Sequence, residues 1–326
     1  MSTILHTYNV NHALSDAFWN LRVSGIREES RNGPVLVMPG LFVTEYDNPL
    51  ERVLFNKKRD ANHVFHLMET IWMFAGRSGV SWLKQFNSKY DAYADPDGRV
   101  WGAYGARWRT AFWVGDTNTR DQLLEIIRVL KTDRDSRQAV LQMWDAHLDL
   151  GTKHADRPCN THVYFDCRGG RLNMTVCCRS NDALWGAYGA NVVHFSMLQE
   201  LIAHGVGVPV GVYRQMSNNF HVYTDLPMVQ EFLETPPIVE DLYQLNGNER
   251  ILPLLAPWED VPTFLNDCHA FCNGYTTTTA FLTNVAAPLR DAYLARKAKE
   301  PWDLTRVPDC DWKTGFQIWL ANRGEE

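Results

Sequence analysis

The sequence predicts an α+β fold built on a mixed or antiparallel sheet, and three observations lead to this class. Helix-like and strand-like stretches mix without regular alternation, which argues against a doubly wound parallel sheet. Two strand-like stretches, His162–Cys167 and Arg171–Cys178, are separated by Arg168-Gly169-Gly170, and Gly-Gly between such stretches is a strong hairpin signal. The Gly-rich loops that bind nucleotide phosphates, G-x-G-x-x-G and G-K-[ST], do not occur in the sequence.

The first half of the chain supplies two strand-like and two helix-like stretches. Val35–Met38 is a short apolar run, and Ala139–Trp144 is a second one. Asn62–Ala75 is apolar at helical spacing, and Gly76 predicts the end of that helix. Thr119–Leu130 has the same spacing and predicts another helix.

The second half contributes the predicted hairpin and two further helices. Asn191–His204 is apolar at helical spacing and is closed by Gly205, and Pro227–Leu233 forms a shorter helix-like stretch. Neither a low-complexity linker nor a long run of charges divides the chain. We therefore expect one domain over residues 1–326, with residues from about 235 to 326 as its C-terminal region.

Composition limits the function. The chain has 326 residues, of which 45% are hydrophobic, enough for one large core or two modest ones. A net charge of -6 argues against a general nucleic-acid binder but not against small anions, which need only a few arginines. No apolar run approaches the roughly 20 residues that span a bilayer, and the N-terminus lacks the pattern of a signal peptide. Seven cysteines, an odd number, indicate reduced thiols and a cytoplasmic location.

Cysteines and a histidine in "CHAFC" raise the question of a metal site. Cys268, His269 and Cys272 have no second ligand pair at zinc-site spacing elsewhere in the sequence. We expect ordinary helix packing there and no metal.

A candidate nucleophile lies in "RPCNTH". Cys159 follows a proline just before a predicted strand, and Arg157 two residues earlier could lower the pKa of its thiol toward the reactive thiolate. A lone cysteine is more often a buried small hydrophobic residue. Pro158 stiffens the approach to the strand, which suits a side chain held at a strand edge.

Two polar clusters follow the cysteine. In "CCRSND", Arg179 and Ser180 could clamp an anion, with Asp182 close by, although for the tetrapeptide alone a strand-end salt bridge is the better explanation. In "SNNFHVY", His221 and Tyr223 alternate along an extended segment and so share a face. Their two polar tips could hold a sugar hydroxyl, whereas a lone histidine here is more often structural.

The order of these features resembles the thymidylate synthase family. The match runs in order from about residue 20 to 230, and the last hundred residues do not resemble the family's usual ending. The segments that carry the resemblance are "ESRNGPVLV", "HLMETIWMFAG", "KYDAYADPDGRVWGAYGARWR", "DRDSRQAVLQMW" and "PCNTHVYFDCRGGRLNMTVCCRSND".

The resemblance implies a fold, a reaction and an assembly. The fold would be thymidylate-synthase-like, a mixed sheet packed with helices whose open face is used for dimerisation. The reaction would transfer a one-carbon unit from 5,10-methylenetetrahydrofolate to C5 of a pyrimidine deoxynucleotide 5'-monophosphate. In it a thiolate adds at C6 so that C5 can attack the folate iminium carbon. The homodimer would share its phosphate sites, with no need for nucleic acid or a membrane.

The resemblance also implies a role for each candidate residue. Cys159 would be the nucleophile, Glu69 the proton relay, and Tyr104 part of the water network that removes the C5 proton. The substrate-binding residues would be Arg31, Arg179 and Ser180 for the phosphate, Arg137 for the partner's phosphate, Asn191 for the base, and His221 and Tyr223 for the 3'-hydroxyl. Asp182 would contribute to catalysis and contact the folate pterin, with Tyr90 and Tyr93 also on the folate side.

Four departures from the family pattern bear on the product. The usual Arg-Arg pair is Arg137-Gln138, the usual tryptophans of "YDAYAD" are Tyr90 and Tyr93, and the familiar C-terminal tail has no match in "IWLANRGEE". The stretch from Asp182 to Asn191 is one residue longer, so an ungapped alignment places Ala190 at the base-reading position.

These departures favour water over hydride at the last step. The exocyclic methylene intermediate gives a hydroxymethyl group with water, and a methyl group with a hydride from a folate held flat by large aromatics and a closed tail. "RSND" also resembles the deoxycytidylate hydroxymethylase branch, whose members suit a virus that modifies its own DNA. We therefore expect the enzyme to make 5-hydroxymethyl-dCMP from dCMP, or the corresponding hydroxymethyl product from dUMP. Reductive methylation is the alternative, followed by a non-catalytic nucleotide or RNA binder.

The string "WGAYGA" occurs twice, at residues 101–106 and 185–190. The first copy supplies Tyr104 and the second leads into Asn191. Small residues in both copies allow the backbone to approach a ligand closely. We expect two walls of one pocket that are similar by convergence, because the flanking sequences do not match.

Overall fold

The structure of the protein is a computed structural model that describes residues 2–111, 113–114, 118–245 and 249–325. Its main sheet is mixed, with β1 and β4 parallel, β11 and β9 parallel, and the other neighbours antiparallel. The strands lie in the spatial order β1 (Thr3–Thr7), β4 (Phe42–Tyr46), β11 (Val210–Ser217), β9 (Leu172–Cys178), β8 (Asn160–Asp166) and β7 (Val140–Gln142).

Two smaller sheets accompany the main sheet. The first has the order β10 (Asn181–Asp182), β12 (Phe220–Tyr223), β3 (Gly33–Val37) and β2 (Ile26–Ser30). The second pairs β5 (Trp113–Val114) with β6 (Asn118–Thr119). Because β9 leads into β10 and β11 into β12, the main sheet delivers both strands to the same end of the molecule.

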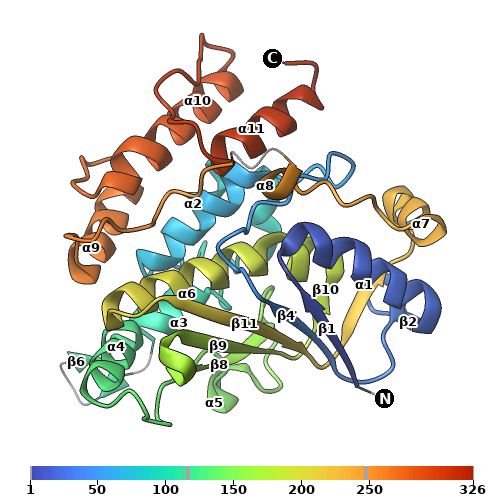
Figure 1. The fold of residues 1–326 in the computed structure, drawn as a ribbon, viewed down its shortest axis with the longest axis horizontal. Coiled ribbons are helices and arrows are strands. Elements are labelled where there is room, and N and C mark those ends of the chain that lie inside the picture. Colours follow the sequence, from blue (N-terminus) through green and yellow to red (C-terminus); the bar gives the residue numbers. More distant parts are fainter. Residues whose placement is uncertain (1, 112, 115–117, 246–248, 326) are drawn as a thin grey trace.

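Helices cover one face of the main sheet, as Figure 1 shows, and α6 contacts β9 and β11 directly. The helices are α1 (Val10–Ser24), α2 (His63–Phe74), α3 (Tyr104–Arg109), α4 (Gln122–Thr132), α5 (Ala146–Asp149), α6 (Val192–Val206), α7 (Pro227–Glu234), α8 (Leu242–Leu245), α9 (Val261–Cys272), α10 (Ala287–Ala298) and α11 (Asp311–Ala321). Two π-helices, Ala183–Asn191 and Leu282–Ala286, lead into α6 and α10, and 3₁₀ helices span Leu83–Gln85, Ser88–Tyr93 and Arg168–Gly170.

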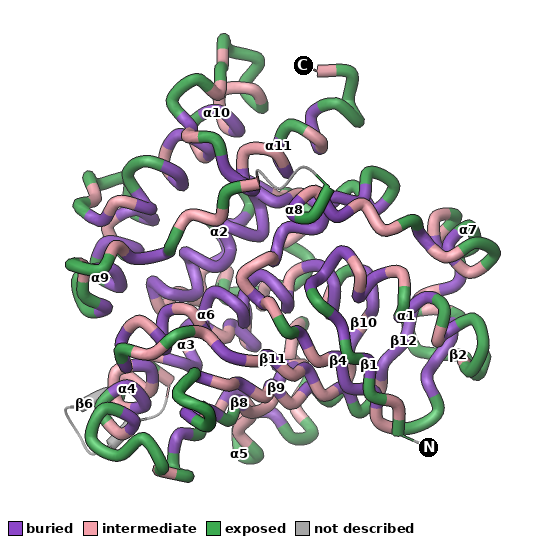
Figure 2. The backbone as a smooth tube through the Cα atoms, in the orientation of Figure 1, coloured by how far each residue is buried: buried purple, intermediate pink, exposed green. Residues whose placement is uncertain are grey.

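Helix α2 lies at the centre of the molecule. All of its residues are buried, as its unbroken purple trace in Figure 2 shows. It contacts α6 on one side and α9, α10 and α11 on the other. Burial on every side explains why apolar residues occur all round this helix, since an amphipathic stripe suffices only for a surface helix.

The C-terminal helices pack against α2, and Figure 1 shows α10 and α11 at the top of the molecule and α9 at its left. One hydrophobic cluster includes Phe18 of α1, Ile71 of α2 and Phe264, Leu289 and Phe316 of the C-terminal helices. The divergent residues from about 235 onward therefore form part of the wall around α2.

The α+β prediction with a mixed sheet is confirmed, including the hairpin. Strands β8 and β9 pair antiparallel, and the turn between them places Gly169 and Gly170 at positive φ, which glycine adopts without strain. The predicted helix from Thr119 begins only at Gln122, because Asp121 caps it and Thr119 belongs to β6.

The predicted helix end at Gly205 is wrong. Gly205 lies inside α6, where a side chain would collide with Ile127 of α4, and the helix ends at Gly207 in a left-handed conformation. Gly205 is therefore a site of close helix packing, and Gly207 is the terminator.

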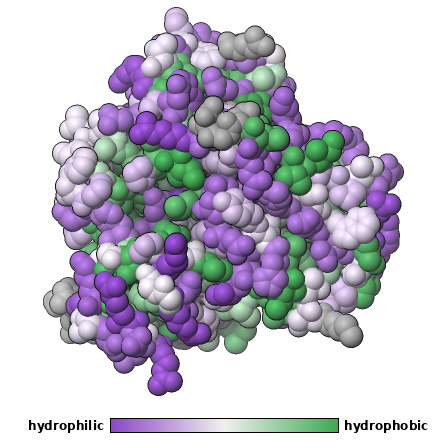
Figure 3. Space-filling view, viewed as in Figure 1, coloured by the Kyte–Doolittle hydropathy of each residue, from purple (hydrophilic) through white to green (hydrophobic). Residues whose placement is uncertain are grey.

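The surface agrees with the composition. Hydrophilic residues cover much of the face in Figure 3, with apolar residues in separate patches. Within the described ranges no helix is both long and apolar enough to cross a membrane.

Candidate active site

Two neighbouring cavities are lined by all the candidate residues except Arg137. The first, here the inner cavity, has a volume of about 780 Å³ and is lined by Glu69, Tyr90, Tyr104, Asn191 and His194 among others. The second, here the arginine cavity, has a volume of about 540 Å³. The candidate residues that line it are Arg31, Cys159, Arg179, Ser180, Asp182, His221 and Tyr223.

Glu69 is a buried carboxylate at the inner cavity. Tyr90 Oη donates a hydrogen bond to Glu69 Oε1 at 2.6 Å, and His194 Nε2 lies 3.1 Å from Glu69 Oε2. Burial, and next the Glu69 charge, raise the pKa of Tyr90 well above its ordinary value, so the phenol stays protonated and donates. Tyr90 was expected on the folate side, and the structure adds this contact with the acid.

Tyr104 connects the two cavities. Its hydroxyl oxygen accepts hydrogen bonds from the backbone N–H of Cys159 at 3.1 Å and of Asn160 at 3.0 Å, and from Asn160 Nδ2 at 3.0 Å. Its ring stands in the inner cavity, while Cys159 lines the arginine cavity. The phenol therefore fixes the strand end that carries the thiol.

Two opposing effects set the pKa of Cys159. Burial is the larger effect and raises the pKa of the thiol above its ordinary value. Arg179 opposes it most strongly, with Nη2 3.8 Å from Sγ. Arg31 also lowers this pKa, and Arg157 does so least of the three arginines, so the predicted role of Arg157 is minor.

The side chains of Asn160, Asn181 and Asn191 form a buried amide network. Asn160 Nδ2 donates to Asn191 Oδ1, and Asn191 Nδ2 donates to Asn181 Oδ1, both at 3.1 Å. The network ends at Ser217, which accepts from Asn181 Nδ2 at 2.9 Å, and at Tyr104. Neighbouring amides thus hold the carboxamide of Asn191 in one orientation.

The π-helix Ala183–Asn191 explains why Asn191 reaches this position despite the longer sequence. A π-turn closes i→i+5 hydrogen bonds and so holds one more residue per turn than an α-helix. Asp182 caps it by accepting from the N–H of Trp185 at 2.6 Å. Ala190 and Asn191 both line the inner cavity, but of the two side chains only that of Asn191 has polar atoms to offer a base.

Asp182 lines the arginine cavity. Burial raises the pKa of its carboxyl group, against the lowering effects of the Trp185 N–H, His221 and Arg59. Its Oδ2 is buried and has no hydrogen-bond partner among the described residues. A raised pKa and a free oxygen are the properties of a proton-handling or ligand-binding carboxyl group.

The remaining residues of the arginine cavity come from several elements. Arg31 lies at the turn between β2 and β3, and Arg179 follows β9, with its Nε donating to Pro158 O at 2.9 Å. His221 and Tyr223 both line the cavity from β12, with ring centres 5.4 Å apart, as their alternation predicted. The turn also supplies Asn32, whose Nδ2 donates to Tyr223 Oη at 3.3 Å.

Arg137 and Tyr93 stand apart from the other candidates. Arg137 is exposed in the segment before β7 and does not line either cavity within this chain. Tyr93 lines the inner cavity but is 51% exposed, with its ring 5.3 Å from that of Tyr90. One chain thus assembles the site without Arg137.

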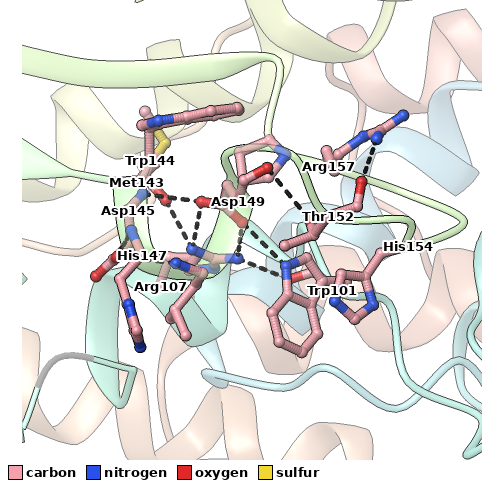
Figure 4. A network of polar contacts seen from close by, with 12 residues as sticks. Trp101, Arg107, Met143, Trp144, Asp145, His147, Asp149, Thr152, His154 and Arg157 are labelled. Atoms are coloured by element: carbon pink, nitrogen blue, oxygen red, sulfur yellow. Dashed lines mark hydrogen bonds and ion pairs between the residues drawn. The ribbon is translucent and has the colours of Figure 1, made fainter.

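A polar network supports the segment that leads to Cys159 (Figure 4). Arg107 forms a buried ion pair with Asp149 at 2.7 Å, and Trp101 Nε1 also donates to Asp149, at 2.9 Å. The His154 ring stacks on Trp101, with ring centres 3.6 Å apart and planes inclined by 5°. Arg157 donates to the carbonyl oxygen of Thr152 at 2.6 Å. The approach to Cys159 is therefore held by contacts along its length.

The two copies of "WGAYGA" do line one cavity, as predicted, but they fold differently. In the first copy Tyr104 begins α3, whereas Tyr188 of the second copy lies in the π-helix, fully buried and bonded to Thr44 at 2.9 Å. The expected reason for the glycines is wrong for Gly105. A Cβ there would lie 2.1 Å from the carbonyl oxygen of Met73, so the close neighbour is α2.

Sequence reasoning missed His194 and the partners of Asn191. His194 follows Asn191 by three residues, and residues at that spacing share a helix face, so this signal was present in "NVVHF". Asn160 and Asn181 had no such signal, because β8 and β10 bring them to Asn191 only in the folded chain.

Cys268 and Cys272 pack as expected. Both are buried on α9, and burial raises the pKa of each thiol, that of Cys272 to about 12. Their thiols are therefore protonated near neutral pH and behave as small apolar groups.

Comparison with known proteins identifies the family. The model of the thymidylate synthase family matches residues 25–252. A deoxyuridylate hydroxymethyltransferase of Pseudomonas phage M6 is 49% identical over 98% of this chain and 94% of its own length. Enzymes of the same name from Bacillus phage SP01 (35% identical, 71% of this chain, 62% of that protein) and Delftia phage PhiW-14 (28%, 68% and 62%) are also similar.

The family match ends where the sequence stops resembling the family pattern. Helices α9, α10 and α11 lie beyond residue 252, whereas the similarity to the Pseudomonas phage protein extends over nearly the whole chain. The matched region contains all the candidate site residues. The chain belongs to the thymidylate synthase family and is a one-carbon transferase.

Proposed function

We propose that this enzyme hydroxymethylates C5 of dUMP, with 5,10-methylenetetrahydrofolate as the one-carbon donor. The observation that carries the proposal is the juxtaposition at Tyr104, which joins the strand end of Cys159 to the cavity of Glu69. A nucleophile and an acid–base group on adjoining cavities are what C5 chemistry requires. The three phage relatives named deoxyuridylate hydroxymethyltransferase favour this reaction and uracil as the base.

Cys159 is the nucleophile in this proposal. Its thiolate adds to C6 of the base, which gives C5 the electron density to attack a one-carbon unit. Since burial raises the pKa of the thiol, the cations around Sγ must favour the thiolate, and Arg179 contributes most. A bound phosphate near these arginines would offset part of their effect.

The phosphate and sugar lie in the arginine cavity. Arg31, Arg179 and Ser180 hold the 5'-phosphate, because guanidinium groups and a hydroxyl match its oxygens. His221 and Tyr223 hold the 3'-hydroxyl of the deoxyribose.

The folate lies in the inner cavity. Aromatic side chains around that cavity, among them Tyr90, Tyr93 and Trp185, suit a planar pterin ring, and Lys58 and Lys89 suit the carboxylates of its glutamate. Asp182 lines the neighbouring arginine cavity, and in this proposal its Oδ2, which lacks a partner among the described residues, contacts the pterin from that side. Glu69 relays protons to and from the reacting groups.

Asn191 reads the base. Uracil presents an acceptor at O4 and a donor at N3, cytosine presents the reverse, and a carboxamide serves either ring if it can flip. A flip of Asn191 requires Asn160 and Asn181 to change with it, since otherwise donor faces donor and acceptor faces acceptor. Discrimination should therefore be large. The sequence-based preference for dCMP stays a prediction, and the names of the relatives favour dUMP.

The enzyme functions as a homodimer with shared phosphate sites. The face of the main sheet opposite α6 exposes Ile4, Val140 and Tyr164, which are 38% to 59% accessible and apolar or aromatic. Arg137 stands three residues before Val140 on the edge strand β7. We infer that pairing through this face would bring Arg137 to the arginine cavity of the second copy.

Reductive methylation is the second candidate. Trp185 and Trp319 line the inner cavity and offer large aromatic surfaces that could hold a folate for hydride transfer. Trp319 belongs to α11, outside the region that matches the family. The product decides between the two reactions, since both share every earlier step.

Mass spectrometry of the nucleotide product tests the proposal. The enzyme is incubated with methylenetetrahydrofolate and dUMP, dCMP or CMP in parallel. A product heavier than dUMP by CH₂O supports hydroxymethylation, and one heavier by CH₂ replaces it with methylation. If dCMP reacts faster than dUMP, the assignment of uracil as the base is wrong. If CMP reacts fastest, the assignment of deoxyribose as the sugar is wrong. If no nucleotide gives a product, the protein is a nucleotide-binding protein and not this enzyme.

A further inference from the structure

His194 is a buried histidine beside the proposed acid–base group. Its Nε2 lies 3.1 Å from Glu69 Oε2, and the two side chains are 3% and 5% exposed. Within the described residues Nε2 has no partner in hydrogen-bond geometry, so its contact with Glu69 is close but not well directed. His194 shares with Asn191 the face of α6 that lines the inner cavity.

The Glu69 carboxylate has one polar neighbour at each oxygen. Tyr90 donates to Oε1, and His194 stands against Oε2. The two contacts differ in strength, so the two oxygens differ in how freely they can accept a proton. The well-directed hydrogen bond from the phenol occupies Oε1, whereas Oε2 keeps a lone pair that can accept a proton. The nearby His66 adds no positive charge near neutral pH, because burial, followed by His63, Arg59 and His194, lowers its pKa well below the ordinary value.

We propose that His194 is a positioning residue that orients Glu69 to deliver water to the methylene intermediate, and so selects the hydroxymethyl product. This inference rests on the proposed function. The exocyclic methylene carbon at C5 is an electrophile open to water, thiols or hydride. A carboxylate fixed between Tyr90 and His194 gives water the advantage, since it takes the proton as the oxygen attacks.

The step balances without an oxidant or reductant. The water oxygen bonds to the methylene carbon, its proton passes to Glu69, and the electron pair of the C5=CH₂ bond moves into the ring as the O4 enolate. Return of that pair forms the C5=C6 bond and expels the Cys159 thiolate from C6. Tetrahydrofolate leaves unoxidised.

A matched pair of variants tests the role. His194→Gln keeps an N–H donor, and His194→Met has similar length without one. His63→Gln is the control, because His63 is 3% exposed like His194, lies on α2 with Glu69, and does not line the inner cavity. Each enzyme receives dUMP tritiated at C5, methylenetetrahydrofolate and 2-mercaptoethanol, which traps the methylene intermediate as a thioether.

The readout is the amount of hydroxymethyl product per tritium released, because tritium loss precedes water addition. His194→Met should lower this ratio about tenfold and raise the thioether in proportion, while His194→Gln should retain most of it and His63→Gln all of it. Tyr90→Phe removes the hydrogen bond to Glu69 Oε1 and should also lower this ratio. It serves as a second test of a fixed Glu69 if His194→Met folds poorly.

Equal losses of tritium release and product in His194→Met, with the ratio unchanged, would show that His194 only fills space and would overturn the inference. A ratio lowered as much by His63→Gln would overturn it too. If the wild-type enzyme releases tritium but forms no hydroxymethyl product, the proposed function itself is wrong, whatever the variants do.

Discussion

The inner cavity and the arginine cavity differ in how completely one chain builds them. In the inner cavity, the functional groups contact each other: Glu69 meets Tyr90 and His194, and Asn191 is held by Asn160 and Asn181. In the arginine cavity, Arg179 donates to the backbone, and Arg31 is exposed at a turn. The polar groups of the inner cavity are thus prearranged, whereas by our proposal the arginines of the other cavity gain their partners from a phosphate and from a second subunit.

This difference follows from electrostatics. A buried amide left without any partner costs about 1–3 kcal/mol and a buried carboxylate costs more, so such groups are stabilised by partners within the protein. Exposed arginines are solvated by water and need no such partner before phosphate arrives. Variants of the prearranged groups and of Cys159 should therefore lose chemistry, whereas variants of the exposed arginines should lose binding.

The largest effect is expected where the cavities meet. Cys159→Ser should lower turnover at least about a thousandfold, because a hydroxyl is a far weaker nucleophile than a thiolate near neutral pH. Binding of dUMP should survive, since the phosphate and sugar contacts are untouched. Single-turnover kinetics measure the loss of turnover, and calorimetric titration measures the binding of dUMP. Activity retained at more than a few per cent would remove Cys159 from the mechanism.

The next effect tests whether the arginine cavity is shared. Arg137→Ala and Cys159→Ser should each be inactive as pure dimers. Subunit exchange between them should recover up to about a quarter of wild-type activity, because half the dimers are then hybrids with one intact site. Mixtures that stay inactive, after native mass spectrometry has shown hybrids, would contradict a crossed site.

A smaller effect should follow from loosening the amide network. Asn181→Ala removes one of the two amides that hold Asn191 and leaves only Asn160 to oppose a flip, so it should reduce the ratio of kcat/KM for dUMP over dCMP about tenfold, chiefly by admitting dCMP. Asn191→Asp should shift preference further toward dCMP. An unchanged ratio in both variants would mean that Asn191 does not face the base.

The smallest effect concerns the thiol. Since burial raises the pKa of Cys159 and Arg179 lowers it most, Arg179→Ala should raise that pKa further, and alkylation by iodoacetamide should need higher pH. Arg157→Ala should move the profile less. The rate of alkylation between pH 6 and pH 10, roughly the range around an ordinary thiol pKa, measures both shifts. A larger shift for Arg157→Ala would reverse the assigned order.

Local signals made much of this molecule predictable. The hairpin with Gly169 and Gly170 and the apolar helix around Glu69 follow from spacing and turn chemistry. Residues that act through tertiary contact were not predictable in this way. Tyr90 contacts Glu69 from a 3₁₀ helix, and Asn160 contacts Asn191 from strand β8. The periodicity of the sequence therefore predicts neither contact. The prediction that the helix ends at Gly205 was wrong because glycine is favoured both where helices pack closely and where a helix ends.

The π-helix before α6 has a consequence for transferring knowledge between relatives. It stores one surplus residue in a wider turn, so the segment can lengthen while Asp182 and Asn191 at its ends keep their places. Counting along an alignment would then assign the base to Ala190, one residue before Asn191, which we propose reads it. A chimaera that exchanges this segment should therefore be cut before Asp182 and after Asn191. A cut within the segment would change the register of α6 by one residue. Such a change would rotate His194 away from Glu69 by about 100°.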